Sequence, residues 1–292
     1  MTEENLYDVA FSFETTLTVI EKKTLLDKYG SVKEIFKIAG GSIKNIIGRN
    51  WKGSKYEPER FLKEAEKAIP FMEKVGIKTA RFDNPSYPKS LTLMPDLPFL
   101  IYYKGNINYN YNKSIAIVGT REPDEEGIET TKKLTTVLVN NGFSIVSGLA
   151  KGIDSISHDT CVKNGGKTLA VLGCGIDRTY PADNRQLVRE ILDNSGAIIS
   201  EYPPGIPPQR WLFPRRNRII VGLSRATLIV QAPEKSGSLI TAILCADYNK
   251  DLFVYRPLSD TNDVFKGNIN LINNGAKDIK NGEEIIDDLT IH

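Results

Sequence analysis

A positively charged segment with aromatic neighbours stands out in this sequence of 292 residues. Residues 202 to 233 include no acidic residue but carry five arginines, and Trp211 and Phe213 lie among them. Guanidinium groups neutralise phosphates and flat rings stack on unpaired bases, so the segment suits a single-stranded polyanion. A solvent-exposed charged surface produces the same pattern, and charge alone does not separate the two interpretations. The arginines are Arg210, Arg215, Arg216, Arg218 and Arg225.

Three loops rich in glycine and small residues are further candidates for binding phosphate groups. Each follows a short apolar run, and backbone N–H groups at glycine approach an anion closely. The same residues also suit tight turns between strands and helices, and Asp154 suits the cap of a helix that begins there. The candidates are Gly119, Thr120 and Arg121 in the first loop, Ser147, Gly148, Lys151 and Gly152 in the second, and Gly237 and Ser238 in the third.

Residues for catalysis or metal binding are scarce. The sequence has two histidines, His158 and the terminal His292, and its three cysteines form no C-x-x-C pair, so neither a zinc site nor a disulfide framework is expected. It contains no G-x-S-x-G, Walker A or G-x-G-x-x-G motif. His158 lies four residues after Asp154, a spacing more typical of a hydrogen-bonded structural group than of a general base. We therefore expect no cofactor and no metal. The residues give enzyme activity no support but leave it open, with carboxylates such as Glu201 and Asp177 as candidate acids.

Short apolar runs alternate with helical segments from residue 114 onward. Nearly continuous hydrophobicity in such runs is typical of parallel strands that helices cover on both faces. The sequence therefore predicts an α/β fold with a doubly wound, mainly parallel sheet. Ligands bind outside the carboxyl ends of the strands in such a sheet, and the three candidate loops follow strands there. The runs are 115–118, 144–146, 169–172, 197–199, 227–230 and 252–254.

The region before the sheet is predicted to be a small helical domain at residues 1–65. Apolar residues recur there at helical spacing, interrupted at Gly30 and at Gly40-Gly41. A further helix is expected at residues 58–72. Residues 66–292 form the second unit, with a proline-rich connecting segment between residues 85 and 98 and the core of the sheet at 114–276. A strand is expected at residues 99–103, ahead of that core.

The overall composition excludes several classes of protein. Hydrophobic residues make up 40% of the chain and charged residues 25%, values typical of a globular protein. No stretch approaches the ~18 uninterrupted apolar residues of a membrane-spanning helix, and the first residues lack the pattern of a secretion signal. We therefore expect a cytoplasmic protein without membrane contact. The formal net charge of +2 conceals the arginine segment, because acidic residues gather elsewhere in the chain.

Six motifs in order resemble the DNA-processing protein A (DprA/Smf) family. They lie at residues 116–121, 147–158, 175–181, 200–205, 213–220 and 236–242, and the segments at 85–91 and 102–106 are also similar to that family. The resemblance implies a cytoplasmic, non-catalytic protein that binds single-stranded DNA through an extended Rossmann domain and is usually a homodimer. It also implies protection of incoming DNA during natural transformation, and loading of the recombinase RecA past single-strand-binding protein.

The resemblance also implies which residues contact DNA. Carried over by motif, the residues that contact phosphates are Gly119, Thr120, Arg121, Ser147, Gly148, Lys151, Arg215, Asn217 and Arg218, with Phe213 stacking or supporting the pocket. Gly152, Gly237 and Ser238 complete the predicted site. The N-terminal helices are expected to be SAM-like or helix-hairpin-helix-like. Two departures are that Gln231 stands where the family often has Glu, and that the C-terminal winged helix of many members is not expected here.

A second class of function stays open from the sequence. Nucleotide-binding sensors, and the lysine-decarboxylase-like phosphoribohydrolases that act on nucleoside monophosphates, are also Rossmann-like proteins with phosphate-binding loops. A Pro-Gly-Gly-x-Gly-Thr run and a downstream Glu are expected in those enzymes, whereas this chain has Ser-Gly-Ser-Leu-Ile-Thr at residues 236–241. Release of a free base from a nucleoside monophosphate would favour this alternative.

Overall fold

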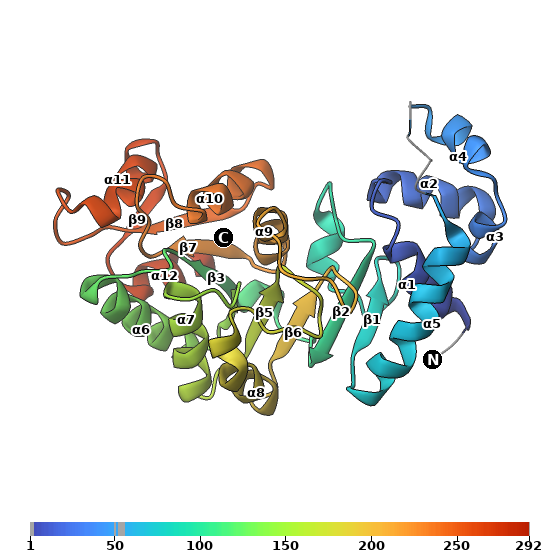
Figure 1. Ribbon diagram of the computed structural model, residues 1–292. Helices are drawn as coiled ribbons and strands as arrows, with labels where there is room; N and C mark the ends of the chain where they lie inside the picture. Colours follow the sequence, from blue (N-terminus) through green and yellow to red (C-terminus); the bar gives the residue numbers. More distant parts are fainter. Residues whose placement is uncertain (1–2, 50, 52–55, 292) are drawn as a thin grey trace.

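A nine-stranded sheet runs through the part of the chain that the structure describes (Figure 1). The structure is a computed structural model and describes residues 3–49, 51 and 56–291, so that His292 lies outside it. The strands are β1 (Lys78–Arg81), β2 (Leu100–Gly105), β3 (Ser114–Val118), β4 (Ser144–Ser147), β5 (Thr168–Leu172), β6 (Ala197–Ser200), β7 (Ala226–Ile229), β8 (Asp251–Tyr255) and β9 (Lys277–Ile279). Their order in the sheet is β1-β2-β6-β5-β4-β3-β7-β8-β9. Neighbours from β6 to β9 are parallel, whereas β1 pairs antiparallel with β2, and β2 with β6.

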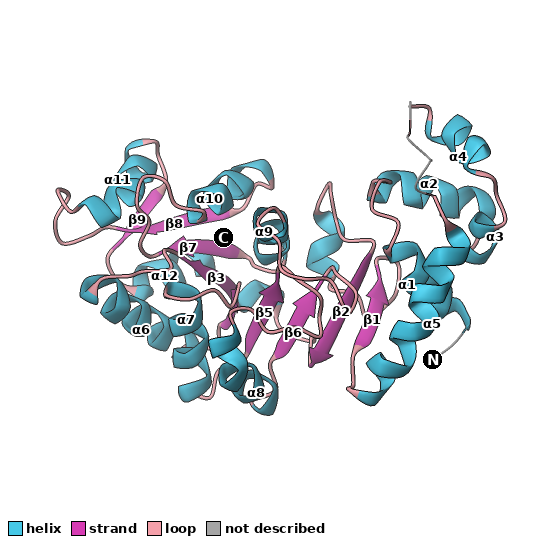
Figure 2. Cartoon of the chain, in the orientation of Figure 1, coloured by secondary structure: helices cyan, strands magenta, loops and turns pink. Residues whose placement is uncertain are grey.

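Helices cover both faces of the sheet and form a further cluster beyond its β1 edge (Figure 2). One face is covered by α6 (Glu125–Asn140), α7 (Ile153–Lys163), α8 (Arg185–Asp193) and α12 (Gly282–Ile291). The other face is covered by α9 (Leu212–Gly222), α10 (Ser238–Asp247) and α11 (Lys266–Asn273). The cluster at the edge consists of α1 (Glu3–Ser12), α2 (Val19–Tyr29), α3 (Val32–Phe36), α4 (Gly40–Ile47) and α5 (Pro58–Lys74).

The central strands form because their apolar side chains are buried on both faces. Every residue of β3 and of β5 is buried, which explains why these runs show no alternation of apolar and polar residues. The predicted α/β fold with a doubly wound, mainly parallel sheet is confirmed. The sequence did not predict β1 and β9, because they have four and three residues and consist mostly of polar side chains.

The N-terminal helices pack against the β1 and β2 edge of the sheet. The hydroxyl oxygens of Ser12 in α1 and Tyr102 in β2 are 2.7 Å apart. Arg81 in β1 pairs with Asp8 in α1 at 2.8 Å. The predicted helix at residues 58–72 is confirmed by α5, but the predicted domain boundary at residue 65 falls inside this helix. The helical region therefore extends beyond that boundary and shares a core with the end of the sheet.

The strand order creates a topological switch point between β3 and β7. From β3 the chain moves outward through β4, β5 and β6, and it then returns to place β7 on the other side of β3. The loops that follow β3 and β7 therefore lead away in opposite directions, and doubly wound folds bind ligands in the crevice between such loops. Two of the three candidate loops, at residues 119–121 and 237–238, follow these two strands.

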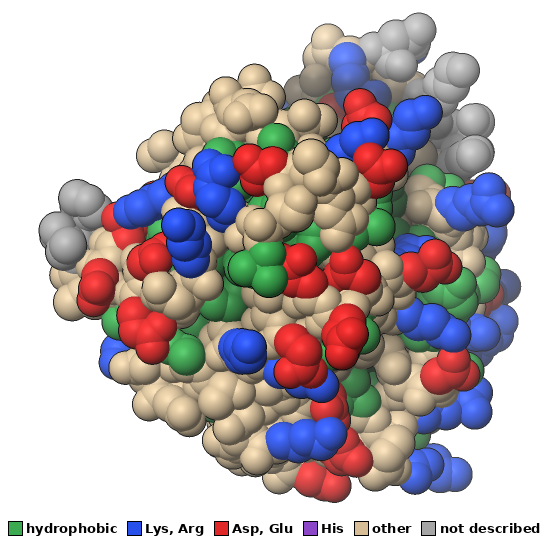
Figure 3. Space-filling model, turned by 90° about the vertical axis from the view of Figure 1, so that its left-hand side faces the viewer, with side chains coloured by type: hydrophobic (Ala, Val, Ile, Leu, Met, Phe, Trp, Pro, Cys, Tyr) green, Lys and Arg blue, Asp and Glu red, His purple; other side chains and the backbone are tan. Residues whose placement is uncertain are grey.

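The face of the molecule at its α11 end carries mixed charge (Figure 3). Acidic and basic side chains are interspersed over this face, with hydrophobic side chains visible in small patches between them. Basic charge is therefore not concentrated on this side. Among the described residues, no helix has the length and apolar character needed to span a membrane.

Candidate functional site

A cavity of about 740 Å³ lies at the switch point, and we call it the switch-point cavity. The loops after β3 and β7 form it together with the first residues of α9 and α10. The fold therefore brings together loops that are far apart in the sequence. Seven of the predicted site residues line the cavity, namely Gly119, Thr120, Arg121, Phe213, Asn217, Gly237 and Ser238.

Three cations of the switch-point cavity have no acidic partner in the part of the chain that the structure describes. Arg121, Arg210 and Lys235 line the cavity and are exposed, and none of them forms an ion pair with a residue that the structure describes. The remaining charged side chains in the lining are the cation of Arg216 and the acids Glu122 and Asp154. Basic groups therefore outnumber acidic ones, and unpaired positive charge in a concave site attracts a polyanion.

Aromatic rings lie next to these cations. The ring centroids of Tyr180 and Phe213 are 5.5 Å apart with their planes tilted by 36°. The Arg121 guanidinium lies 5.7 Å from the centroid of the Phe213 ring, close enough for a cation–π contact. Tyr180 is 45% exposed, so its ring presents apolar surface on which a flat group can stack.

The loop after β3 is tightly packed, and only part of it is available to a ligand. A Cβ at Gly119 would lie 2.9 Å from the Gln231 carbonyl oxygen and 2.5 Å from Ile153 Cγ1, so the glycine is required for close approach. The backbone N–H of Thr120 donates to that same carbonyl at 2.7 Å. Arg121 is therefore the group of this loop that remains free to bind an anion.

Gln231 holds the loop after β3 through a neutral side chain. It is fully buried, its Nε2 donates to Asp124 Oδ1 at 2.7 Å, and its Oε1 accepts from the backbone N–H of Asp124 at 3.1 Å. On the α9 and α10 side, Asn217 Nδ2 donates to Thr241 Oγ1 at 3.1 Å. Gln231 and Asn217 thus join the segments that form the cavity wall.

The second candidate loop is closed to an external anion. The Ser147 hydroxyl is fully buried and donates to the Ile117 carbonyl at 2.6 Å. The backbone N–H groups of Gly148 and Ala150 donate to Asp154 Oδ2 at 3.1 and 3.4 Å. An internal carboxylate therefore occupies the position that the sequence suggested for a phosphate.

Lys151 and Gly152, from the same loop, lie outside the switch-point cavity. Lys151 is exposed and pairs with Asp183 at 2.7 Å. Gly152 has a φ of 76°, in the region that favours glycine, and is the N-cap residue of α7. Asp154 is therefore not the N-cap residue of this helix. It binds amides of the preceding loop instead.

Arg216 is a buried cation beneath the switch-point cavity. It is 4% exposed, and its Nη1 donates to the carbonyl oxygens of Gly148 and Val171. Burial lowers the pKa of Arg216, and the nearby carboxylate of Asp154 opposes this shift. Burial likewise raises the pKa of Asp154, and the Arg216 charge opposes that. Arg216 therefore ties α9 to the loops after β4 and β5, in addition to adding positive charge to the lining.

Arg215 and Arg218 do not line the switch-point cavity, although the sequence placed them in the site. Arg218 is 5% exposed, and its Nη2 donates to Glu201 Oε1 at 2.5 Å. Its Nε lies 3.5 Å from Asp96 Oδ2. Arg215 is exposed, and its Nε lies 3.8 Å from Glu201 Oε2. The arginines of the segment therefore lie in different environments, and internal acids hold Arg218.

His158 is a buried structural group. Its Nδ1 lies 2.6 Å from the Thr168 hydroxyl oxygen. Burial lowers the pKa of His158 to about 3, and the Arg216 charge adds to this shift. The imidazole, which lies on the buried side of α7, is therefore neutral at physiological pH. Among the described residues, no cluster of three or more His, Cys, Asp or Glu side chains could hold a metal ion.

Sequence reasoning missed several residues of the switch-point cavity. Lys235 follows Glu234 directly, so its segment shows no excess of positive charge. Tyr180 lies in the loop after β5, more than thirty positions before Phe213, and only the folded chain brings the two rings together. Arg210 was visible as part of the acid-free segment but was not among the predicted DNA contacts, although it lines the cavity.

The fold and the switch-point cavity together define a Rossmann-like protein whose sheet edge presents unpaired cations beside aromatic rings. The family model of DNA recombination-mediator protein A matches residues 78–290. The chain belongs to this family, and the resemblance to DprA/Smf proteins inferred from the motifs is confirmed.

Relatives of known sequence are similar over most of this chain. DNA processing protein DprA of Bacillus subtilis is 37% identical over 236 residues, which are 80% of this chain and 79% of that protein. Protein Smf of Synechocystis is 41% identical over 248 residues, which are 84% of this chain but 59% of that protein. The chain therefore spans less than two thirds of the length of that second relative.

Two solved structures share the fold. The X-ray structure of DNA processing protein A from Streptococcus pneumoniae matches with a TM-score of 0.77 at 31% identity, over 98% of this chain and 97% of that one. A structure concerned with the single-stranded DNA binding mode of DNA processing protein A from Helicobacter pylori matches with a TM-score of 0.66 at 32% identity. That match covers 73% of this chain and 95% of the other.

Proposed function

We propose that this chain binds single-stranded DNA in the switch-point cavity. The observation that carries the proposal is a set of three exposed cations beside the rings of Phe213 and Tyr180. These cations, which form no ion pair with any described residue, are Arg121, Arg210 and Lys235. Cations neutralise the phosphates of a strand, and exposed rings stack on its unpaired bases. The similar Helicobacter pylori protein, whose structure concerns its single-stranded DNA binding mode, supports the same ligand.

Membership of the family supports a wider role for this binding. In the cytoplasm the chain would protect incoming single-stranded DNA during natural transformation or recombination. It would then load RecA onto strands covered by single-strand-binding protein, acting as a homodimer without catalysis. Light scattering tests the homodimer, and RecA filament formation on strands covered by single-strand-binding protein tests the loading step. A monomeric protein that leaves filament formation unchanged would contradict this role.

The binding proposal is tested with labelled oligo-dT and with a duplex of the same length, titrated at several salt concentrations. The logarithm of the affinity should fall linearly with the logarithm of the salt concentration. We expect a slope of about −2, because three phosphates are neutralised and each phosphate on a single strand contributes ~0.7. The combined variant Arg121→Ala, Arg210→Ala and Lys235→Ala should remove most of this slope. Tighter binding to the duplex, or an unchanged slope in the variant, would contradict the proposal.

Two other exposed arginines provide a matched control. Arg185 and Arg189 are exposed, lie outside the switch-point cavity and form no ion pair with a described residue. Changing both to alanine alters the net charge without touching the proposed site, and the salt slope should stay at the wild-type value. A loss of slope in this control would show that general charge, and not the cavity, determines binding.

The same preparations distinguish the alternative from the sequence. A nucleotide-processing enzyme would release a free base from nucleoside monophosphates, which chromatography detects. We expect no release, because the buried carboxylate of Asp154 is already bonded to two loop amides and the other acid of the cavity lining, Glu122, is exposed. Base release that is lost in Glu122→Gln would replace the DNA-binding proposal with this alternative.

A further inference from the structure

A second cavity, of about 610 Å³, lies between the N-terminal helices and the Rossmann-like part, and we call it the α9 groove. One wall is the connection from α1 to α2 with the start of α2, and the other is the loop from β6 to α9 with α9 itself. Trp211, in the lining, is 60% exposed. Pro214 lines both this groove and the switch-point cavity. The first turn of α9 therefore separates two neighbouring cavities.

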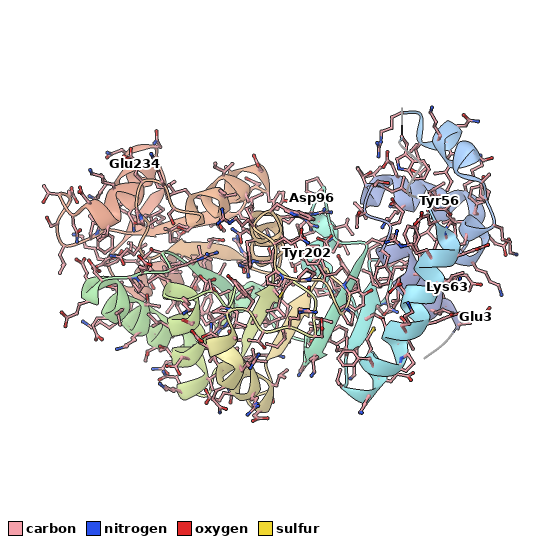
Figure 4. All side chains as sticks on the ribbon, viewed as in Figure 1. Glu3, Tyr56, Lys63, Asp96, Tyr202 and Glu234 are labelled. Atoms are coloured by element: carbon pink, nitrogen blue, oxygen red, sulfur yellow. The ribbon has the colours of Figure 1, made fainter. Side chains whose placement is uncertain are left out.

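Three buried polar atoms in the α9 groove lack a hydrogen-bond partner in the part of the chain that the structure describes. They are Arg218 Nη1, Glu201 Oε2 and the hydroxyl oxygen of Tyr202. Figure 4 labels Tyr202 and Asp96 close to α9. The side chains of Arg218 and Glu201 are 6% and 15% exposed. Buried polar atoms are nearly always bonded, and these three are closed to solvent in this structure, so a ligand in the groove bonds to them only after side chains of the lining shift.

The chemistry of the three atoms is well defined. The Arg218 guanidinium donates only, and the Glu201 carboxylate accepts only. Burial raises the pKa of Tyr202 to about 12, so the hydroxyl keeps its proton at neutral pH and can donate or accept. The lining thus holds an unpaired donor and an unpaired acceptor that belong to one ion pair, whose other atoms, Arg218 Nη2 and Glu201 Oε1, lie 2.5 Å apart.

The charges of the α9 groove cancel, in contrast to those of the switch-point cavity. The lining contains three basic and three acidic side chains, and its other residues are neutral. A phosphate gains little in such a site, whereas a flat neutral group with hydrogen-bonding edges fits both the apolar walls and the unpaired atoms. The charged residues are Lys22, Arg215 and Arg218, against Glu14, Asp96 and Glu201.

We propose that the α9 groove binds one unpaired nucleobase of the DNA strand, and that this base has an N–H group beside a carbonyl oxygen. Arg218 Nη1 donates to the carbonyl oxygen, Glu201 Oε2 accepts from the N–H group, and the Trp211 ring supplies a stacking surface. Thymine and guanine carry this pair of groups. Adenine has no carbonyl group, and the carbonyl of cytosine has no N–H group beside it. The inference rests on the proposed function and adds selection among bases to it.

An oligonucleotide of N3-methylthymine tests the inference, because the methyl group removes the N–H group and leaves every phosphate in place. Wild-type protein should bind oligo-dT about tenfold more tightly than the methylated strand, since the base loses a hydrogen bond to a charged acceptor. The Tyr202 hydroxyl, the third unpaired atom, donates to the second carbonyl oxygen of a thymine seated in this way, so Tyr202→Phe should weaken binding of oligo-dT about fivefold. The methylated strand should be unaffected, because the N3-methyl group against Glu201 keeps its base out of the groove. Trp211→Ala should also reduce the difference between the two strands.

The controls separate this inference from the proposed function. Tyr29→Phe removes a hydroxyl outside the groove and should leave both affinities unchanged. Arg121→Ala, in the switch-point cavity, should weaken both strands by the same factor. Equal wild-type affinity for the two strands, with Arg121→Ala still weakening both, would overturn the base-binding groove and leave the proposed function intact. Failure of wild-type protein to bind either strand would overturn both.

Discussion

Replacement of Arg121 separates the charge of the switch-point cavity from its aromatic stacking. The Arg121 guanidinium lies 5.7 Å from the centroid of the Phe213 ring and has no ion-pair partner among the described residues. Arg121→Ala removes both the positive charge and the planar group over the ring. Arg121→Lys keeps the charge and removes only the planar group.

The expected magnitudes follow from these two contributions. A hydrogen bond to a charged group contributes ~1.5 kcal/mol, so Arg121→Ala should weaken binding of oligo-dT about tenfold at low salt. The salt slope should become less negative by ~0.7, because one phosphate fewer is neutralised. Arg121→Lys should keep the slope and weaken binding about threefold, because the ammonium keeps the charge but lacks the planar, forked guanidinium.

Fluorescence anisotropy of labelled oligo-dT, titrated at four or more salt concentrations, measures affinity and slope together. Arg189→Ala serves as the control, because Arg189 is exposed, has no ion-pair partner among the described residues and lies outside the cavity. A wild-type slope in Arg121→Ala would refute the assignment of this side chain to a phosphate. A reduced slope in Arg121→Lys would refute the separation of charge from stacking.

Two further predictions concern stability and are measured by urea unfolding. Arg218→Ala should lower the free energy of unfolding by ~3 kcal/mol or more, because it removes a buried side chain and leaves the part-buried Glu201 without its partner at 2.5 Å, with only the longer contact to Arg215. Arg215→Ala, at an exposed pair of 3.8 Å, should change it by less than ~1 kcal/mol, and equal effects would contradict the assigned burial. Burial lowers the pKa of His158 from 6.5 to about 3. Between these two pH values the unfolded state binds a proton at this residue and the folded state does not, so stability falls as the pH falls below 6.5. Between pH 7 and pH 5 wild-type protein should therefore lose ~2 kcal/mol more than His158→Gln, whereas equal losses would show that folded His158 accepts the proton.

Much of the fold was predictable because the central strands are buried on both faces. The runs at 115–118 and 169–172 are continuous in apolar residues, and such runs have few alternative interpretations. The strands at the edges carry less information. The residues of β1 and β9 are mostly polar and few, so they form through pairing with neighbours and not through a pattern of their own. The boundary expected at residue 65 falls inside α5, which runs without interruption from Pro58 to Lys74.

The candidate site was predictable where the strand order determines it. The residues after β3 and at the start of α10 converge because carboxyl ends of parallel strands share one edge. The sequence did not reveal which cations are already paired. Arg218 is bonded to Glu201, seventeen positions earlier in the sequence, and its Nε lies near Asp96, which comes before most strands of the sheet. A count of charges along the sequence treats Arg218 and Arg121 alike. In the structure Arg218 is paired with Glu201, whereas Arg121 forms no ion pair with a described residue.

The bonds that join the walls of the switch-point cavity have a practical consequence. The backbone bond from Thr120 to Gln231 and the side-chain bond from Asn217 to Thr241 link neutral groups. Salt screens the exposed cations that attract a strand, but it leaves such neutral bonds in place. A rise in ionic strength therefore releases the ligand from a receptor whose shape is unchanged. The protein should elute from an immobilised strand in salt and bind again after dilution, without a refolding step.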